Sequence, residues 1–187
     1  MASTADIRKG LCIEFNHNIY KVVEFLYVKP GKGLAFVRTK LKSLTTGRVL
    51  EKTFPAGHKI EEIRVKSSLY QYLYEDENGF HFMNMEDYNQ VHLPKTLIEN
   101  SQFLKEGIHV MITFRVDDET SLTVEMPANI ILEVTYTEPG IKGDTATNAT
   151  KAATLETGAI VQVPLFITTG ERIKINTEDG TYIERAK

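Results

Sequence analysis

The chain has 187 residues, of which 42% are hydrophobic and 25% are charged; these proportions exclude a disordered chain, and no stretch reaches the ~20 apolar residues of a membrane-spanning helix. The net charge of −3 conceals a split, because residues 1–64 carry 12 Lys/Arg and 6 Asp/Glu, residues 65–127 carry 4 and 11, and residues 128–187 carry 6 and 8. A basic first third is typical of a module that binds a polyanion, although an accidental imbalance on a solvated surface gives the same count.

The N-terminal segment has one cysteine and no long apolar run. Because the apolar core of a signal peptide is missing, we expect a cytoplasmic protein with no membrane partner. Cys12 cannot form an internal disulfide, and its neighbours Leu11 and Ile13 predict a buried side chain. One cysteine and five scattered histidines give no zinc-ligand spacing.

Residues 1–64 contain five apolar runs separated by turns that hold Gly, Pro or Asn. These runs predict β-strands at 11–15, 19–28, 34–44, 49–54 and 60–65. Five short strands in this length are typical of a small SH3-like or KOW-like barrel.

Two further units of similar size follow. In residues 65–127, strands are expected at 68–75, 80–84, 107–116 and 121–126, with a helix at 94–104 where Leu97, Ile98 and Leu104 have helical spacing. In residues 128–187, strands are expected at 129–138, 159–167, 171–177 and 181–186, with a polar loop at 139–153. Each unit has the size of a five-stranded OB fold, so we predict an all-β protein of three small barrels, at 1–64, 65–127 and 128–187.

The tetrapeptide KPGK, which begins at Lys29, predicts a tight turn with a lysine at its end. Pro30 fixes φ near −65° and Gly31 accepts positive φ, as a type II turn requires. Lys32 then leaves the turn, and Gly33 gives it no bulky neighbour. This geometry favours a lone lysine on a narrow tip, although an ordinary solvated turn lysine fits the same residues.

The strand after this turn is expected to have a buried face and a basic face, because side chains alternate along a strand. We expect Ala35, Val37, Thr39 and Leu41 on the first face, and Phe36, Arg38, Lys40 and Lys42 on the second. The three cations are then about 7 Å apart, a scale similar to the phosphate spacing of one nucleic-acid strand. No acidic residue lies between Glu24 and Glu51 to neutralise them. A solvated strand face, or cations that protect a sheet edge, are the alternatives.

Nucleotide-binding and catalytic motifs are missing. A P-loop is excluded, because Gly33 and a strand follow Lys32 where that motif needs a hydroxyl residue and a helix. No GxSxG, HExxH or Cys/His nucleophile pattern is present. His81, His92 and His109 lie in strand-like runs and are expected to be packing or surface residues rather than ligands. These residues make no case for an enzyme.

Three stretches, in the correct order, resemble the bacterial elongation factor P family. They are VKPGKGLAFVRTKLKSLTTG at 28–47, FHFMNMEDYNQ at 80–90 and KAATLETGAIVQVPLFITTG at 151–170. The last is the strongest match, because KAA, Gly, Val-Pro and a final Gly recur at fixed spacing in the family's C-terminal signature. The resemblance covers essentially the whole chain, including a third domain that the eukaryotic and archaeal homologue lacks.

The resemblance implies three β-barrels in an L-shaped, tRNA-like arrangement and a role in translation elongation. Such a factor binds the ribosome between the P and E tRNA sites, positions the CCA end of P-site peptidyl-tRNA and relieves stalling at consecutive prolines. The implied partners are both ribosomal subunits with their rRNA, the peptidyl-tRNA, mRNA at the E site and a lysine-modifying enzyme. We expect a monomer without a cofactor or metal.

The resemblance also implies roles for single residues. Lys32 is the tip that approaches the CCA end and the candidate for covalent modification, with Pro30, Gly31 and Gly33 shaping the tip. Contacts to RNA backbone are expected from Lys29, Arg38, Lys40 and Lys42. Gly143, Asp144 and Thr145 correspond to the loop that faces the E-site codon, and Tyr182 and Arg185 to contacts with tRNA or the small subunit. The basic stripe alone leaves open a general RNA-binding or RNA-chaperone module.

Overall fold

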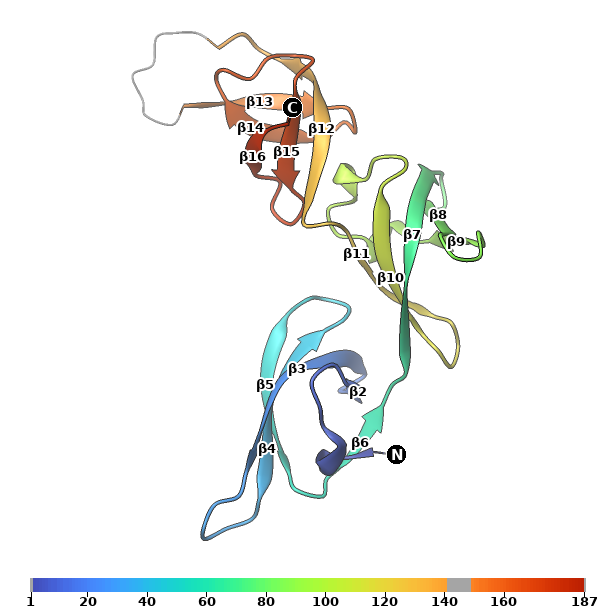
Figure 1. The fold of residues 1–187 in the computed structure, drawn as a ribbon, viewed down its shortest axis with the longest axis vertical. Helices are drawn as coiled ribbons and strands as arrows, with labels where there is room; N and C mark the ends of the chain where they lie inside the picture. Colours follow the sequence, from blue (N-terminus) through green and yellow to red (C-terminus); the bar gives the residue numbers. More distant parts are fainter. Residues whose placement is uncertain (1, 141–148, 187) are drawn as a thin grey trace. The chain divides into compact units, whose positions relative to one another are not determined.

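The computed structural model describes residues 2–140 and 149–186, and its long elements are all β-strands in three antiparallel sheets (Figure 1). The predicted all-β class is therefore confirmed. Within these residues, no helix is long and apolar enough to cross a membrane. The chain forms two compact units: Met1–Ser68 with Ile112–Val124, and Leu69–Met111 with Glu125–Lys187. The predicted boundaries after residues 64 and 127, and the L-shaped arrangement, stay predictions.

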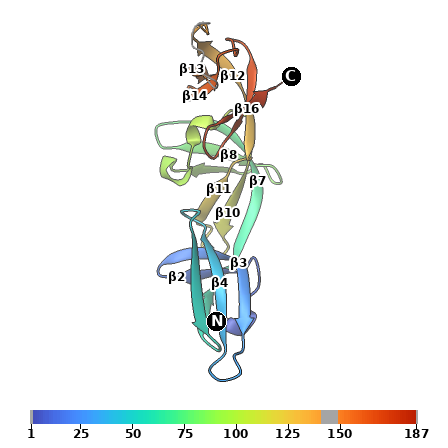
Figure 2. The ribbon, with the colours of Figure 1, turned by 90° about the vertical axis from the view of Figure 1, so that its left-hand side faces the viewer.

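The first sheet has six strands in the order β1-β6-β2-β3-β4-β5. The strands are β1 (Ala2–Ser3), β2 (Cys12–Phe15), β3 (Asn18–Val28), β4 (Phe36–Ser43), β5 (Val49–Pro55) and β6 (Lys59–Glu62), and a 3-10 turn, η1 (Thr4–Asp6), follows β1. The loop between β3 and β4 extends beyond the strands it joins (Figure 2). The core of this sheet is apolar, with Ile7, Leu11, Ile13, Val22, Val37, Leu41, Phe54 and Ile60 buried.

Cys12 lies in a small apolar cluster of the first unit. It is 4% exposed and packs with Ile19 and Ile63, and the half-buried Leu44, Val65 and Leu122 complete the cluster. Burial raises the pKa of the Cys12 thiol, because a thiolate is disfavoured in apolar surroundings. The prediction of a buried cysteine is confirmed.

The second sheet has five strands in the order β11-β10-β7-β8-β9. They are β7 (Val65–Glu75), β8 (Phe80–Asn84), β9 (Gln90–Leu93), β10 (His109–Arg115) and β11 (Ser121–Glu125). The helix predicted at 94–104 is wrong, because the chain there forms two single 3-10 turns, η2 (Lys95–Leu97) and η3 (Ser101–Phe103). Asn100, between them, has φ of +56°, which an α-helix cannot contain. The apolar spacing reflects instead the burial of Ile98, Phe103 and Leu104.

The third sheet has the order β14-β13-β12-β15-β16. Its strands are β12 (Asn129–Thr137), β13 (Thr150–Leu155), β14 (Ile160–Pro164), β15 (Arg172–Asn176) and β16 (Tyr182–Arg185). The expected loop at 139–153 was too long, since β13 begins at Thr150 and buries Ala153 and Leu155. Phe103 and the partly buried Ile108 join the core of this sheet within the second unit.

Candidate nucleic-acid interface

The loop that carries the candidate tip closes the β3–β4 hairpin. Pairing of the two strands ends at Val28 and Phe36, which leaves residues 29–35 as the connection. The predicted type II turn with positive φ at Gly31 is wrong, because Gly33 has φ of +129° and Gly31 lies outside the positive range. Seven connecting residues do not force reversal within one tight turn, and the positive φ that only glycine accepts readily falls two residues later, at Gly33.

Lys32 lies exposed between these two glycines. A Cβ at Gly31 would meet nothing within 4 Å, and a Cβ at Gly33 would meet only Pro30 Cγ at 3.6 Å. Leu34 follows with 88% of its surface exposed. Among the described residues, no carboxylate forms an ion pair with Lys32 or Lys29. The loop therefore presents two cations and one apolar side chain to the outside of the unit.

The alternation predicted for β4 is confirmed. Val37, Thr39 and Leu41 are at most 1% exposed, and the Thr39 hydroxyl donates to the Lys52 carbonyl at 2.8 Å. That hydrogen bond explains how a polar side chain is accommodated on the core face. On the other face, Arg38 and Lys42 are exposed and Lys40 is half-buried.

Lys40 is neutralised, contrary to the expectation from the sequence. Its partners in the sheet are Glu24 on β3 and Glu51 on β5, and its Nζ lies 2.8 Å from Glu24 Oε2. The hydrogen bond with Lys40 lowers the pKa of Glu24, and the same bond raises the pKa of Lys40. Glu24 and Glu51 are the acidic residues at the two ends of the interval that has none. In the sheet they lie on either side of Lys40.

Arg38 and Lys42 have different neighbours. Arg38 is paired with Leu26 and Thr53, and Lys42 with Lys21 and Val49. Directly paired residues place their side chains on the same face, so the exposed Lys21 adds a cation beside Lys42 that was not expected from the sequence. Counting strand residues outward from the loop would place Val22 opposite Lys42; the bulge between Val22 and Glu24 shifts the register by one residue and brings Lys21 there instead.

Apolar side chains accompany these cations. Leu26 is 58% exposed and Tyr27 is 53% exposed, both near the tip end of β3. A depression of about 220 Å³ is lined by Glu24, Phe25, Leu26, Arg38, Thr39, Lys40 and Glu51. An arrangement of cations, aromatic rings and aliphatic side chains suits the phosphates and base faces of RNA.

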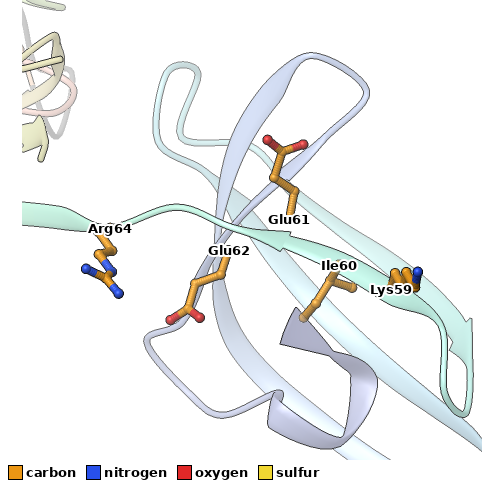
Figure 3. A pocket seen from close by; sticks show the side chains of 5 residues that line it. All are labelled: Lys59, Ile60, Glu61, Glu62 and Arg64. Atoms are coloured by element: carbon orange, nitrogen blue, oxygen red, sulfur yellow. The ribbon is translucent and has the colours of Figure 1, made fainter. Parts of the chain in front are cut away.

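A second hollow in the first unit, of about 570 Å³, lies along β6 and the residues that follow it (Figure 3). Figure 3 shows Glu61 on the opposite side of the strand from Glu62. Glu62 faces Arg8 at 3.7 Å. Mixed charges with one weak ion pair give neither a uniform phosphate-binding surface nor a nucleophile with its base.

The candidate site residues of the C-terminal domain differ in how far the structure describes them and in their burial. Gly143, Asp144 and Thr145 lie outside the described residues. Tyr182 is partly buried against the core of the third sheet. Arg185 Nη1 lies 3.2 Å from Glu171 Oε1, and the Arg185 guanidinium lies 5.4 Å from the centroid of the Phe166 ring. Both residues are on β16, yet Tyr182 packs inward while Arg185 contacts other side chains at the surface.

Comparison with known proteins bears on all three sheets. Family models match in chain order: the elongation factor P KOW-like domain at 3–60, the elongation factor P OB domain at 65–121 and the elongation factor P C-terminal domain at 130–185. An elongation factor P of Flavobacterium psychrophilum is 61% identical over 187 residues, and one of Christiangramia forsetii is 62% identical, each match covering 100% of both chains.

A solved structure also matches the fold. A translation initiation factor eif-5a family protein from Naegleria fowleri aligns with a TM-score of 0.51 and 19% identity. The match covers 67% of this chain and 96% of that one. At this identity the likeness shows the fold alone.

Proposed function

The chain belongs to the elongation factor P family, and we propose that it binds the ribosome between the P and E tRNA sites and positions the CCA end of P-site peptidyl-tRNA. Its function lies in translation, and it is a translation factor and not an enzyme. We further propose that it relieves stalling at consecutive prolines. We also propose that it acts in the cytoplasm as a monomer. The proposed division into domains at 1–64, 65–127 and 128–187 is supported by the spans of the three family models.

The observation that carries this proposal is Lys32, exposed between two glycines on a loop that extends beyond its sheet (Figure 2). Because no carboxylate of residues 2–140 and 149–186 forms an ion pair with Lys32, its charge stays available for the phosphates of a tRNA end. The absence of a side chain on Gly31 and Gly33 lets the tip enter a crowded RNA cavity. Lys32 is also the proposed site of covalent extension by a lysine-modifying enzyme, because the residue is exposed.

The cations Lys29, Arg38 and Lys42 are proposed to bind RNA backbone, and Lys21 is added to them. Lys40 is proposed to contribute less to RNA binding, because it already forms an ion pair with Glu24. Each phosphate contact releases counterions, so ribosome binding should weaken as salt increases. Gly143, Asp144 and Thr145 remain proposed for the E-site codon, and Tyr182 and Arg185 for tRNA or the small subunit. The Glu171 contact would have to open for Arg185 to bind phosphate.

The physical mechanism is ordering rather than chemistry. The fixed φ of proline restricts the geometry of the nascent chain. Holding the peptidyl-tRNA end in a reactive geometry lowers the entropic part of the barrier to peptide bond formation. The reacting groups stay those of the ribosome and its tRNAs, so the factor needs no catalytic side chain.

The test compares Lys32→Ala with Lys59→Ala, which removes an exposed lysine of β6 outside the proposed interface. Peptide formation is timed on messages with and without consecutive prolines. We expect Lys32→Ala to lose most of the stimulation on Pro-Pro messages and Lys59→Ala to keep it. Equal stimulation by both variants would remove Lys32 from the mechanism. Equal affinity for free single-stranded RNA and for ribosomes carrying peptidyl-tRNA would favour the general RNA-binding module instead.

A further inference from the structure

Three metal-ligating side chains meet at the β7–β8–β9 end of the second sheet. Asp76 follows the last residue of β7, His81 lies on β8 and His92 lies on β9. The register pairs His81 directly with His92, so both imidazoles are on one face. One ligand atom from each of the three residues lies within 4.8 Å of the other two.

The β7–β8 turn aims the Asp76 carboxylate at this point. Asp76 Oδ1 accepts hydrogen bonds from the backbone N–H groups of Asn78 at 2.8 Å and Gly79 at 3.0 Å. Its other oxygen, Oδ2, lies 2.8 Å from His81 Nε2. Two backbone donors therefore fix one carboxylate oxygen, and the second oxygen is left to face the imidazoles.

Gly79 lets the turn approach β9. Its φ is +151°, and a Cβ there would lie 2.2 Å from the Leu93 carbonyl oxygen and 3.0 Å from His92 Nε2. Any side chain at this position would occupy the space beside the His92 nitrogen. The close approach brings an imidazole of β9 to the turn that holds Asp76.

The His81 ring is packed against Tyr74 and is partly exposed to solvent. It stacks on Tyr74, with centroids 4.5 Å apart and planes at 19°, and lies 5.2 Å from the His92 ring. The His81 side chain is 19% exposed, Asp76 is 38% exposed and His92 is exposed. Packing therefore holds the His81 ring and the turn holds the Asp76 carboxylate, while the exposed His92 side chain has room to rotate toward an ion.

We propose that Asp76, His81 and His92 bind one divalent transition-metal ion of the zinc class, with water in the remaining coordination positions. Two imidazoles and one carboxylate are a common donor set for such ions. Bonds of about 2.0–2.2 Å require ligand atoms closer together than 4.8 Å, and rotation of the exposed His92 side chain supplies the contraction. His81 would bind through Nε2, so the metal would replace the hydrogen bond between Nε2 and Asp76 Oδ2, and the proton of the neutral ring would lie on Nδ1. The excess of 11 Asp/Glu over 4 Lys/Arg in residues 65–127 also favours a cation.

This inference goes beyond the proposed function and does not depend on it. The ligands are five and eleven residues apart in the sequence, in an order that fits no metal-binding motif. For this reason His81 and His92 were expected to be packing or surface residues. Only the register of β8 and β9 and the turn at Gly79 bring them together.

The experiment titrates the full-length, tag-free protein with ZnCl₂ in a calorimeter. His92→Gln and Asp76→Asn each remove one ligand, and the control His109→Gln removes an exposed histidine of the same unit outside the cluster. We expect one site in the unchanged protein, a loss of affinity of at least about tenfold in the two ligand variants, and no change in the control. Zinc should also raise the thermal midpoint of the unchanged protein and the control, but not of His92→Gln.

Amide chemical shifts of the unchanged protein give a readout that does not rely on a variant. Added zinc should shift resonances of residues 74–81 and 90–93. Shifts centred elsewhere, no binding, or equal zinc affinity in His92→Gln and the unchanged protein would each overturn the site.

Discussion

Gly33 and Gly31 flank the same lysine, yet replacing each with alanine should have different consequences. Gly33 has φ of +129°, a conformation that L residues rarely adopt, whereas Gly31 lies in the ordinary range with open space where a Cβ would be. Gly33→Ala is therefore strained by its backbone, not by a clash, since the nearest atom is Pro30 Cγ at 3.6 Å. Gly31→Ala is the matched control.

The expected size follows from that strain. Holding alanine in a sparsely populated region costs on the order of 1–3 kcal/mol. The loop at 29–35 is mostly exposed, so it can relieve the strain by changing conformation without unfolding the sheet. A shift of about 1–2 kcal/mol lowers the ratio of the native loop to alternative loop conformations by a factor of about 5–30, and apparent affinity falls by up to the same factor.

The assay measures how much factor gives half-maximal stimulation of Pro-Pro peptide formation. Gly33→Ala should need up to about 5–30 times more protein than Gly31→Ala, while the thermal midpoints of the two variants stay alike. Equal half-maximal concentrations would show that the loop conformation at Gly33 does not matter for activity. A large drop in midpoint would show that the strain reaches the sheet, contrary to the reasoning.

Three further outcomes are expected. Glu24→Gln frees Lys40, so ribosome affinity should rise and the slope of log affinity against log salt should steepen by up to about one unit; an unchanged slope in a KCl series would contradict this. Phe103→Ala should cost about 3–5 kcal/mol in urea unfolding, because the ring is 2% exposed; a loss below about 1 kcal/mol would mean the site collapses around the cavity. The pKa of Glu171 lies below 4.5, mainly because the Thr168 N–H donates a hydrogen bond to it and also because Arg185 does. The folded pKa is therefore lower than the unfolded one. The resulting stabilisation is present above about pH 4.5 and is lost as the pH falls through the folded pKa. Glu171→Gln should therefore flatten the fall of thermal midpoint with acid, and an unchanged acid limb would contradict it.

The alternation along β4 could be predicted from the sequence because it depends only on a period of two. The same reasoning failed for Lys40, because neutralisation depends on which strands lie on either side. Glu24 and Glu51 are 16 and 11 residues away in the chain but are its direct neighbours in the sheet. Residue spacing along one strand carries no information about that register.

Turns and short strands were predicted less well, for a related reason. Pro30-Gly31 fits a type II turn locally, but a seven-residue connection does not require one. The spacing of Ile98 and Leu104 suggested a helix, while Asn100 interrupts the backbone between them. The four residues of β9 and the start of β13 gave too little alternation to distinguish a strand from a loop. These features depend on tertiary packing that overrides local preference.

Buried and exposed side chains alternate along β4, and this alternation determines what a substitution at each position affects. Val37, Thr39 and Leu41 are buried in the core, whereas Arg38 and Lys42 form no ion pair within the described residues. If the outer face of β4 binds RNA as proposed, substitutions at even-numbered positions should change RNA affinity while the sheet stays intact. Substitutions at odd-numbered positions should destabilise the sheet without altering the charge that faces outward. A library of single substitutions across 36–43 should then separate into two alternating classes, one read out by abundance and the other by translation of proline-rich messages.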